Sequence, residues 1–332
     1  MVKETVVVTR RIAESALNLL SSRFKLRLYD SDEPPGSEWL EVNIGDADGV
    51  LCMLSDKFDL DLLEKAKRLK VISSMSVGLD HIDLDAATRR GIYVTYTPDV
   101  LTDATADLTW ALLLGIARRV SEAERFLRGG LWRVAWSPNF FLGSDVYGKT
   151  LGIVGMGRIG YAVAKRARGF DMRILYYQRH RLAEDREKDV GARYSALDEL
   201  LSESDFVTIH LPLTEQTRGL INEARLRLMK PTAYLVNTSR GAIIDEAALI
   251  KALRERWIKG VALDVYSVEP LPKDSPLLQF ENVLLTPHIG SATIETRKRM
   301  AELAAENLVA VLTGRLPLHL ANPDVVRVRP LG

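Results

Sequence analysis

The sequence predicts an α/β protein with two parallel β-sheets, and three observations support this fold class. Short β-rich runs alternate with amphipathic segments along the whole chain. The chain has 332 residues, 47% of them hydrophobic, which is enough for two domains of ordinary size. One glycine-rich turn joins a strand-like run to a helix-like run. Strands that alternate with helical segments are typical of βαβ units and therefore of parallel sheets.

The first alternating series predicts five strands, at residues 5–9, 25–28, 49–54, 71–75 and 92–95. Segments between them, such as residues 60–69, have apolar residues at helical spacing. Thr102 and Asp103 are good helix N-caps, and a long helix is expected over residues 104–127, ending at Gly129 and Gly130.

The second alternating series begins at Leu151 and predicts a sheet of six strands. The strands after the one at Leu151 are expected at residues 172–177, 206–209, 233–236, 260–263 and 282–285. One more strong helix is expected over residues 293–312, ended by Gly314.

Composition and charge exclude several classes of function. The formal net charge is +1, which gives no global electrostatic reason to bind nucleic acid or anionic lipid.

The longest apolar stretch, residues 110–117, is too short to cross a bilayer. The first residues are typical of a strand rather than a signal peptide, so we expect a cytoplasmic protein. Cys52 is the only cysteine, so we expect no disulfide and no metal site. A small molecule is the expected partner.

The motif GMGRIG at residues 155–160 follows an apolar run and opens a helix-like stretch. In this context one glycine permits a tight turn, another lets the backbone approach a phosphate, and the third lets helix pack on strand, while the helix N-terminus faces the anion. A purely structural turn is the alternative. We therefore predict that this loop binds the pyrophosphate of a dinucleotide through Gly155, Gly157, Arg158, Ile159 and Gly160.

Polar residues gather where the strands of the second series end. In open parallel sheets ligands bind beyond the carboxyl ends of the strands. The residues at these ends are QRHR at 178–181, HLP at 210–212, NTSRG at 237–241, Asp264, and His288. A cofactor and a reacting group are therefore expected to meet at this edge.

The end of the second strand bears on the choice of cofactor. Gln178 stands 23 positions after Gly155, where an acidic residue would normally hold the ribose 2′-hydroxyl of NAD. Instead Arg179, His180 and Arg181 follow, and guanidinium groups can bind a 2′-phosphate in bidentate fashion. NADP(H) is therefore favoured, with NAD(H) as the alternative cofactor and a solvated basic loop as the alternative interpretation.

Three residues can supply the chemistry of hydride reduction of a 2-keto acid. The reaction needs a cation to bind the carboxylate and polarise the carbonyl, a proton donor with a pKa near 7, and a group to orient that donor. Arg240, His288 and Glu269 are of these types. A nearby carboxylate favours imidazolium, which keeps the proton available. Spacing alone does not show which histidine is catalytic, because any of the five could be a structural residue: His81, His180, His210, His288 and His319.

Five motifs in order carry a family resemblance: SVGLDHID at residues 76–83, GMGRIG at 155–160, NTSRG at 237–241, LDVYSVEP at 263–270 and TPHIGSA at 286–292. The chain resembles the D-isomer-specific 2-hydroxyacid dehydrogenases over essentially its whole length. The resemblance implies two Rossmann-like or flavodoxin-like domains, with the NAD(P)-binding domain (residues 101–289) inserted in a discontinuous substrate domain (residues 1–100 plus 290–332). It also implies a homodimer formed through a helix and arm at residues 104–147.

The same resemblance implies roles for individual residues. Arg240 would bind the substrate carboxylate and carbonyl, Glu269 would pair with His288, and His288 would donate the proton. Asp264 would contact the nicotinamide carboxamide. The further cofactor-binding residues expected are Gln178, Arg179, His180, Arg181, Leu211, Pro212, Thr217, Thr238, Ser239, Arg240, His288 and Gly290. The substrate-binding residues expected are Leu54, Val77, Gly78, Arg240, His288, Ser291 and Trp136, with Val77 and Gly78 acting through their backbone amides. Trp136 either reaches toward the neighbouring active site or only packs in the interface.

The loop at residues 52–56 reads CMLSD and offers no cation for a phosphorylated substrate. With Leu54 facing a small uncharged end, it looks most like the loop of glyoxylate and hydroxypyruvate reductases. We therefore expect NAD(P)H-dependent reduction of glyoxylate to glycolate and of hydroxypyruvate to D-glycerate. A D-lactate-type or broad-specificity 2-ketoacid reductase is the nearest alternative, and a dinucleotide-sensing, corepressor-like binding protein is a more distant one.

Overall fold

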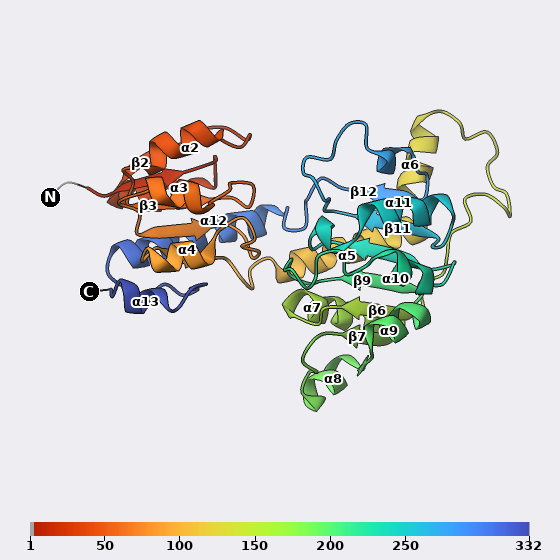
Figure 1. Ribbon diagram of the computed structural model, residues 1–332. Helices are drawn as coiled ribbons and strands as arrows, with labels where there is room; N and C mark the ends of the chain where they lie inside the picture. Colours follow the sequence, from red (N-terminus) through yellow and green to blue (C-terminus); the bar gives the residue numbers. More distant parts are fainter. Residues whose placement is uncertain (1–2, 332) are drawn as a thin grey trace. The chain divides into compact units, whose positions relative to one another are not determined.

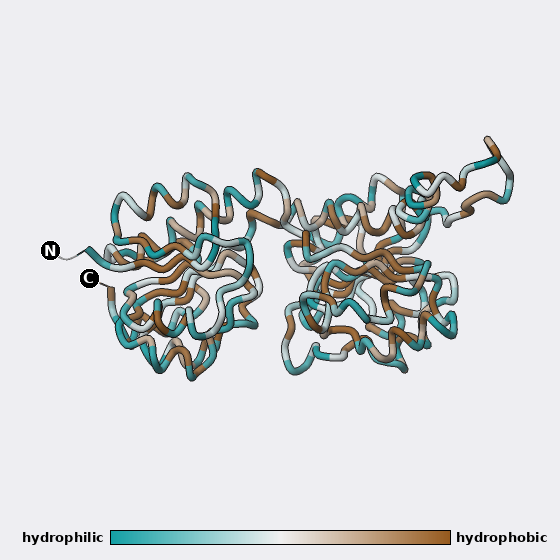
Figure 2. The backbone as a smooth tube through the Cα atoms, turned by 90° about the horizontal axis from the view of Figure 1, so that it is seen from above, coloured by the Kyte–Doolittle hydropathy of each residue, from teal (hydrophilic) through white to brown (hydrophobic). Residues whose placement is uncertain are grey.

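The computed structural model describes residues 3–331, which divide into two compact units. Unit 1 runs to Leu101 and resumes at Ser291, and unit 2 is the continuous segment Thr102–Gly290. Each unit has a parallel sheet covered by helices (Figure 1). In both, hydrophobic segments of the backbone run through the interior of the unit (Figure 2). The α/β class with two parallel sheets is confirmed.

The sheet of unit 1 has five strands in the order β2-β1-β3-β4-β5. They are β1 (Thr5–Val8), β2 (Lys25–Leu28), β3 (Gly49–Cys52), β4 (Val71–Ser74) and β5 (Tyr93–Thr95). All neighbouring pairs are parallel. The five predicted strands are confirmed to within two residues at each end. Val6, Val7 and Val8 in the middle of the sheet are fully buried, because helices cover both faces of a parallel sheet.

The helices of unit 1 are α1 (Glu14–Arg23), α2 (Ser37–Ile44), α3 (Leu60–Lys65), α4 (Leu84–Arg89), α12 (Ile294–Leu312) and α13 (Val325–Val328). Thr293 caps α12 by accepting a hydrogen bond from the Thr296 amide. A Cβ on Gly49 in β3 would lie 3.2 Å from Leu312, so α12 packs directly on the sheet. Helix α12, from the second segment of unit 1, therefore completes the core formed by the first segment.

The sheet of unit 2 has seven parallel strands in the order β12-β11-β10-β9-β6-β7-β8. They are β6 (Thr150–Val154), β7 (Arg173–Tyr177), β8 (Ala192–Tyr194), β9 (Phe206–Ile209), β10 (Tyr234–Asn237), β11 (Gly260–Leu263) and β12 (Val283–Leu285). The prediction of six strands is wrong by one. The missed strand, β8, lies at the sheet edge, and only Ala192 of its three residues is buried, so it has almost no apolar signature.

Helices cover both faces of this sheet. They are α5 (Thr102–Ala117), α6 (Val120–Arg128), α7 (Arg158–Ala167), α8 (Glu184–Val190), α9 (Leu197–Glu203), α10 (Glu223–Leu228) and α11 (Glu246–Arg254), with 3₁₀ turns η1 (Arg168–Phe170), η2 (Gly241–Ile243) and η3 (Pro276–Gln279). Alternate strand residues face opposite layers, so Leu235 packs in the layer with α9, α10 and α11, and Val236 packs in the layer with α5 and α7.

The single long helix expected over residues 104–127 is two helices, α5 and α6. Arg119 between them has a left-handed backbone, with φ of 55°. Helix α5 is largely buried, whereas α6 has no buried residue. The chain returns to the end of α5, where the Ser144 amide donates to the Ala117 carbonyl. A Cβ on Gly143 would lie 2.4 Å from that carbonyl oxygen. This return caps α5 and ends it, which local propensity alone does not indicate.

Within residues 3–331, no helix is both long and apolar enough to cross a membrane. No group of three or more His, Cys, Asp or Glu side chains in the same part of the chain could hold a metal ion. The thiol of Cys52 is free and buried, and burial raises its pKa well above the usual value.

Candidate active site

The glycine motif lies where the sequence predicts, between β6 and α7. Gly155 has φ of 102°, and a Cβ there would lie 2.6 Å from the His210 carbonyl oxygen. A Cβ on Gly160 would lie 2.1 Å from the Gly155 carbonyl oxygen, so both positions require glycine. A Cβ on Gly157, in contrast, would meet no atom within 4 Å. The open space at Gly157, at the N-terminus of α7, fits a pyrophosphate group.

The basic segment after β7 divides into two parts. Arg179 and His180 are exposed, and Gln178 donates from Nε2 to the His180 carbonyl over 2.6 Å. Arg181, in contrast, forms a bidentate ion pair with Glu187, with hydrogen bonds of 2.8 Å (Nε to Oε1) and 2.7 Å (Nη2 to Oε2). Arg179 and Arg181 are the two arginines predicted to bind a 2′-phosphate. Among residues 3–331, Arg181 is paired with a carboxylate and Arg179 is not.

Glu187 is a residue to which the sequence analysis assigns no role. It is buried in α8 and accepts hydrogen bonds from the Arg181 guanidinium and from the Tyr176 hydroxyl. Hydrogen bonding from Arg181, reinforced by Tyr176, lowers the pKa of Glu187 to about 2. Burial, followed by the hydrogen bond to Glu187, raises the pKa of Tyr176 to about 12. These three side chains fix the end of the basic segment against β7.

The turn after β10 is shaped by Asn237, which is fully buried. Its Nδ2 donates to the Arg240 carbonyl over 2.9 Å, and its Oδ1 accepts from the Ser239 amide (3.0 Å) and hydroxyl (2.9 Å). The Thr238 hydroxyl lies 2.9 Å from that of Thr109 in α5. The turn that carries Arg240 is therefore held by the side chain of Asn237 and by the contact between Thr238 and Thr109.

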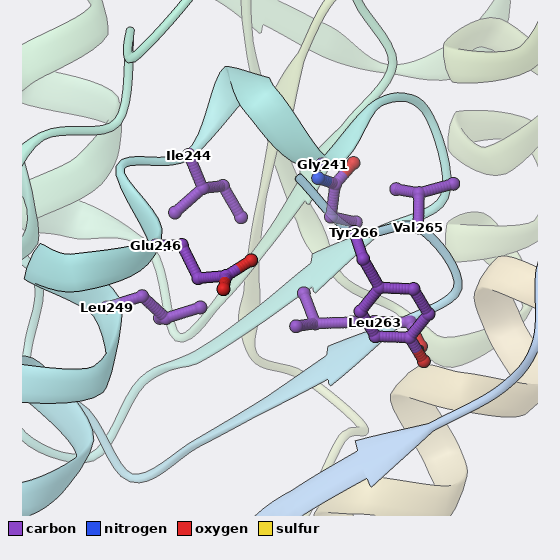
Figure 3. A pocket seen from close by; sticks show the side chains of 8 residues that line it. Gly241, Ile244, Glu246, Leu249, Leu263, Val265 and Tyr266 are labelled. Carbon is purple, nitrogen blue, oxygen red and sulfur yellow. The ribbon is translucent and has the colours of Figure 1, made fainter. Parts of the chain in front are cut away.

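Gly241 allows this turn to approach the segment after β11. A Cβ on Gly241 would lie 1.9 Å from the carbonyl carbon of Tyr266, so no other residue fits there. Figure 3 shows Gly241 next to Tyr266, beside a small cavity lined by side chains such as Ile244 and Leu263. The cavity measures ≈ 10 Å³, room for about one water molecule, so it is a packing gap and not a substrate site.

Glu269 and His288 form a close pair, with 2.6 Å between Glu269 Oε2 and His288 Nδ1. The other carboxylate oxygen accepts from the Tyr266 amide over 3.0 Å. Burial on its own would raise the pKa of Glu269, but the hydrogen bond and charge of His288, with a smaller contribution from Arg240, lower it. Glu269 therefore stays ionised. Because Nδ1 faces Glu269, Nε2 is the ring nitrogen left for proton transfer.

Asp264 holds the backbone on both sides of His288. Its Oδ1 accepts from the Thr286 hydroxyl (2.6 Å) and the Ile289 amide (2.8 Å). His288 itself has a left-handed φ of 52°, which is uncommon outside glycine and clusters at functional sites. Asp264 Oδ2 is buried without a hydrogen-bond partner in the described residues, and burial raises the pKa of this carboxyl. This unpaired oxygen fits the amide donor of a nicotinamide carboxamide.

His210 behaves differently from His288. Burial alone lowers the pKa of its imidazole to about 3, so the ring is neutral at physiological pH. Its carbonyl lies against Gly155, beneath the glycine loop.

Comparison with known proteins agrees with this geometry. A family model described as "D-isomer specific 2-hydroxyacid dehydrogenase, NAD binding domain" matches residues 110–290. A glyoxylate reductase from Korarchaeum cryptofilum is 53% identical over 330 residues, which is 99% of each chain. The chain belongs to the D-isomer-specific 2-hydroxyacid dehydrogenases.

Two solved structures extend the comparison within this family. A crystal structure of a protein from Thermus thermophilus has a TM-score of 0.90 and 47% identity, covering 96% of this chain and 99% of that one. An NADPH-dependent glyoxylate/hydroxypyruvate reductase from Sinorhizobium meliloti, solved with NADP and malonate, has a TM-score of 0.83 and 31% identity, covering 96% and 97%. The matched family segment is an NAD-binding domain and contains Arg240, Glu269 and His288. This dehydrogenase is therefore an NAD(P)-dependent enzyme.

The predicted substrate-binding residues of unit 1 follow two neighbouring strands of its sheet. Leu54 comes after β3 and Val77 after β4, and each is 37% exposed. The Ser76 hydroxyl donates to the Gly78 carbonyl over 2.7 Å and lies 2.7 Å from the hydroxyl of Ser74. The Ser74 hydroxyl also lies 3.1 Å from His81 Nε2. Ser291 begins the second segment of unit 1, and its carbonyl accepts from the Thr293 amide.

Sequence reasoning did not assign roles to the residues that support this dehydrogenase's site. Asn237 and Tyr266 lie inside the motifs and support the site through hydrogen bonds to Arg240 and Glu269. A detectable signal exists for Asn237, because an asparagine directly after a buried strand, with serine two positions on, is typical of an Asx turn. Glu187 carries no such signal, since its pairing with Arg181 is tertiary.

Proposed function

We propose that this protein uses NADPH to reduce glyoxylate to glycolate and hydroxypyruvate to D-glycerate, with NADH as a poorer reductant. The observation that carries the proposal is the Glu269–His288 pair, which lies beside the Arg240 turn at the carboxyl edge of the unit 2 sheet. Relatives about half identical over the full length are named glyoxylate reductase, which supports this choice of substrate.

Each side chain has a defined part in the proposed mechanism. Arg240 binds the substrate carboxylate and polarises the carbonyl as negative charge develops on its oxygen. His288 donates a proton from Nε2 to that oxygen, and Glu269 orients the ring through its contact with Nδ1. When bound, the reduced nicotinamide supplies the hydride. Asp264 Oδ2, which is buried and unpaired in the described residues, would accept the carboxamide N–H and so orient the nicotinamide.

Unit 1 is assigned the recognition of the substrate's ends. The backbone amides of Val77 and Gly78 bind the carboxylate, in a loop that the Ser76 hydroxyl stiffens. Leu54 faces the other end of the substrate, which suits a hydrogen atom or a hydroxymethyl group better than a charged group.

A panel of four keto acids tests the proposed function. Glyoxylate, hydroxypyruvate, pyruvate and 3-phosphohydroxypyruvate are each mixed with the purified protein and NADPH or NADH, and cofactor oxidation is followed by absorbance. We expect turnover with glyoxylate and hydroxypyruvate, and little with the phosphorylated compound. Preference for pyruvate would indicate a D-lactate-type or broad-specificity reductase. Cofactor binding without oxidation of any substrate would indicate a dinucleotide-sensing binding protein.

Arg179 is the residue we assign to the 2′-phosphate of NADP. Replacing it with alanine should weaken NADPH binding by about tenfold to a hundredfold, the worth of a charge-assisted hydrogen bond, and leave NADH binding nearly unchanged. Fluorescence titration with each cofactor measures this. Lys188→Ala is the matched control, because Lys188 is exposed in the adjacent helix and pairs with Glu184. Equal losses of NADPH and NADH affinity in the Arg179 variant would place the 2′-phosphate elsewhere.

We also propose a homodimer formed through the arm after α6. This segment stands away from the rest of unit 2 (Figure 1). It exposes several large apolar side chains: Leu131, Trp132, Val134, Trp136, Phe140, Leu142 and Tyr147. Trp136 is 77% exposed. Apolar side chains gathered on one protruding segment favour burial against a second copy of the chain, in which Trp136 either reaches the partner's active site or packs in the interface.

A further inference from the structure

A buried ion pair lies beneath the loop that carries Leu54. Arg10 follows β1 and is 7% exposed, and Asp56 follows β3 and is 2% exposed. Arg10 Nη2 lies 3.0 Å from Asp56 Oδ1. The two residues are 46 positions apart in the chain and meet because β1 and β3 are parallel neighbours that end at the same edge.

The pair ties down the loop on both sides of Leu54. Asp56 Oδ2 accepts from the Met53 amide over 2.8 Å and from the Thr9 hydroxyl. Arg10 Nη2 also donates to the Ser55 hydroxyl over 2.7 Å, and Arg10 Nη1 donates to the Thr9 carbonyl. Met53, Ser55 and Asp56 are thereby fixed. Leu54, between them, is 37% exposed.

The pair also changes the charge that the loop presents. Residues 52–56 contain no cation, but the folded chain places the Arg10 guanidinium directly beneath them. Asp56 cancels this charge at contact distance in a site with little water, where an unpaired cation would attract anions strongly. The charge of Arg10 beneath the loop is therefore cancelled, and Lys57, which follows the loop, pairs with Asp59 at 2.9 Å.

We propose that the Arg10–Asp56 pair determines substrate specificity: it holds Leu54 in place and cancels the Arg10 charge beneath the loop, so that the enzyme rejects keto acids with a second anionic group. Both residues are positioning residues, since they act through the loop and not on the reacting atoms. The proposal rests on the function proposed above, in which Leu54 faces the far end of the substrate.

Asp56→Asn tests the proposal, with Asp48→Asn as its matched control. Asp48 stands at the opposite end of β3, is 3% exposed, accepts from the Thr5 amide over 2.9 Å and pairs with Arg68 at 3.1 Å. Both variants remove a buried carboxylate charge, one at each end of the same strand, but the Arg68 side chain is 60% exposed and the Arg10 side chain only 9%. Asp48→Asn therefore shows what the loss of a buried carboxylate in this strand region does when the Leu54 loop is left intact.

In Asp56→Asn we expect the KM for glyoxylate to rise about tenfold with kcat within about threefold of wild type, since an interaction of a charged group is lost. The ratio of kcat/KM for 3-phosphohydroxypyruvate to that for glyoxylate should rise about tenfold, because the positive charge of Arg10 is no longer neutralised and can attract the phosphate group. NADPH affinity and both parameters of Asp48→Asn should stay near wild type. An unchanged KM and an unchanged ratio in folded Asp56→Asn would overturn the proposal.

Two further measurements separate this proposal from the proposed function. Amide hydrogen exchange at Met53 should accelerate in Asp56→Asn and not in Asp48→Asn, whatever the substrate is. Arg10→Lys keeps the positive charge but loses the two guanidinium hydrogen bonds to Thr9 and Ser55. It should therefore raise the KM for glyoxylate without raising the kcat/KM for 3-phosphohydroxypyruvate relative to that for glyoxylate. If the wild type reduces none of the four keto acids, the proposed function fails. If the wild type is active but Met53 exchange is unchanged in Asp56→Asn, the ion-pair proposal fails instead.

Discussion

His288→Ala is expected to lower kcat for glyoxylate by about two to four orders of magnitude, the usual worth of a positioned general acid. The variant loses the only group that we assign to deliver a proton to the carbonyl oxygen. It keeps the glycine loop and Asp264, so NADPH affinity should stay within about threefold of wild type. Steady-state kinetics and fluorescence titration measure the two quantities separately.

The left-handed backbone of His288 calls for a second variant. Asparagine tolerates φ near 52° better than alanine does, so His288→Asn preserves the turn between β12 and Gly290 while removing the proton donor. We expect it to be as inactive as His288→Ala. Recovery of turnover in the asparagine variant would show that backbone strain, and not proton donation, is what His288 supplies. Near-normal turnover in the alanine variant would assign the proton donor elsewhere.

Arg240→Ala is expected to lower kcat/KM for glyoxylate by about two to three orders of magnitude, because truncating a charged group that pairs with a buried anion typically costs about 2–5 kcal/mol or more. Both kcat and KM should worsen, since the guanidinium binds the carboxylate in the ground state and the developing oxyanion in the transition state. Arg240→Lys should recover only part of the loss, because a lysine offers a charge without the planar fork.

Arg254→Ala provides the control for Arg240. Arg254 is exposed at the end of α11, and its removal changes the net charge of unit 2 by the same amount. It should leave kinetics unchanged. If Arg240→Ala raises KM and leaves kcat at the wild-type value, the residue binds substrate but does not polarise the carbonyl.

The positions of the strands were predictable because strands of a parallel sheet are buried on both faces and read as short apolar runs. Val6 to Val8 and residues 206–209 are examples. The two features that were not predicted, β8 and the break between α5 and α6, lack such a local pattern. Strand β8 buries a single side chain and carries no such run, and the break between α5 and α6 depends on Gly143 returning to Ala117, which no local pattern records.

The place of the proposed site residues in the fold was predictable, and their roles remain a prediction that rests on the family resemblance. Arg240, Asp264 and His288 each follow a strand, and parallel strands bring such residues to one edge. Arg181 shows the limit of that reasoning. Its charge and position fit a 2′-phosphate, but Glu187 from α8 holds its guanidinium.

Sequence by itself determined the α/β class, the glycine loop and the set of side chains at the carboxyl edge of the unit 2 sheet, because each depends on local pattern and on the direction of the strands. The family resemblance anticipated the pairing of Glu269 with His288 across 19 positions, but tertiary structure alone decided that Arg10 meets Asp56 across 46. The reason is physical. An ion pair is chosen by distance and burial in the folded chain, and residues far apart in sequence acquire both only when the strands beneath them pack.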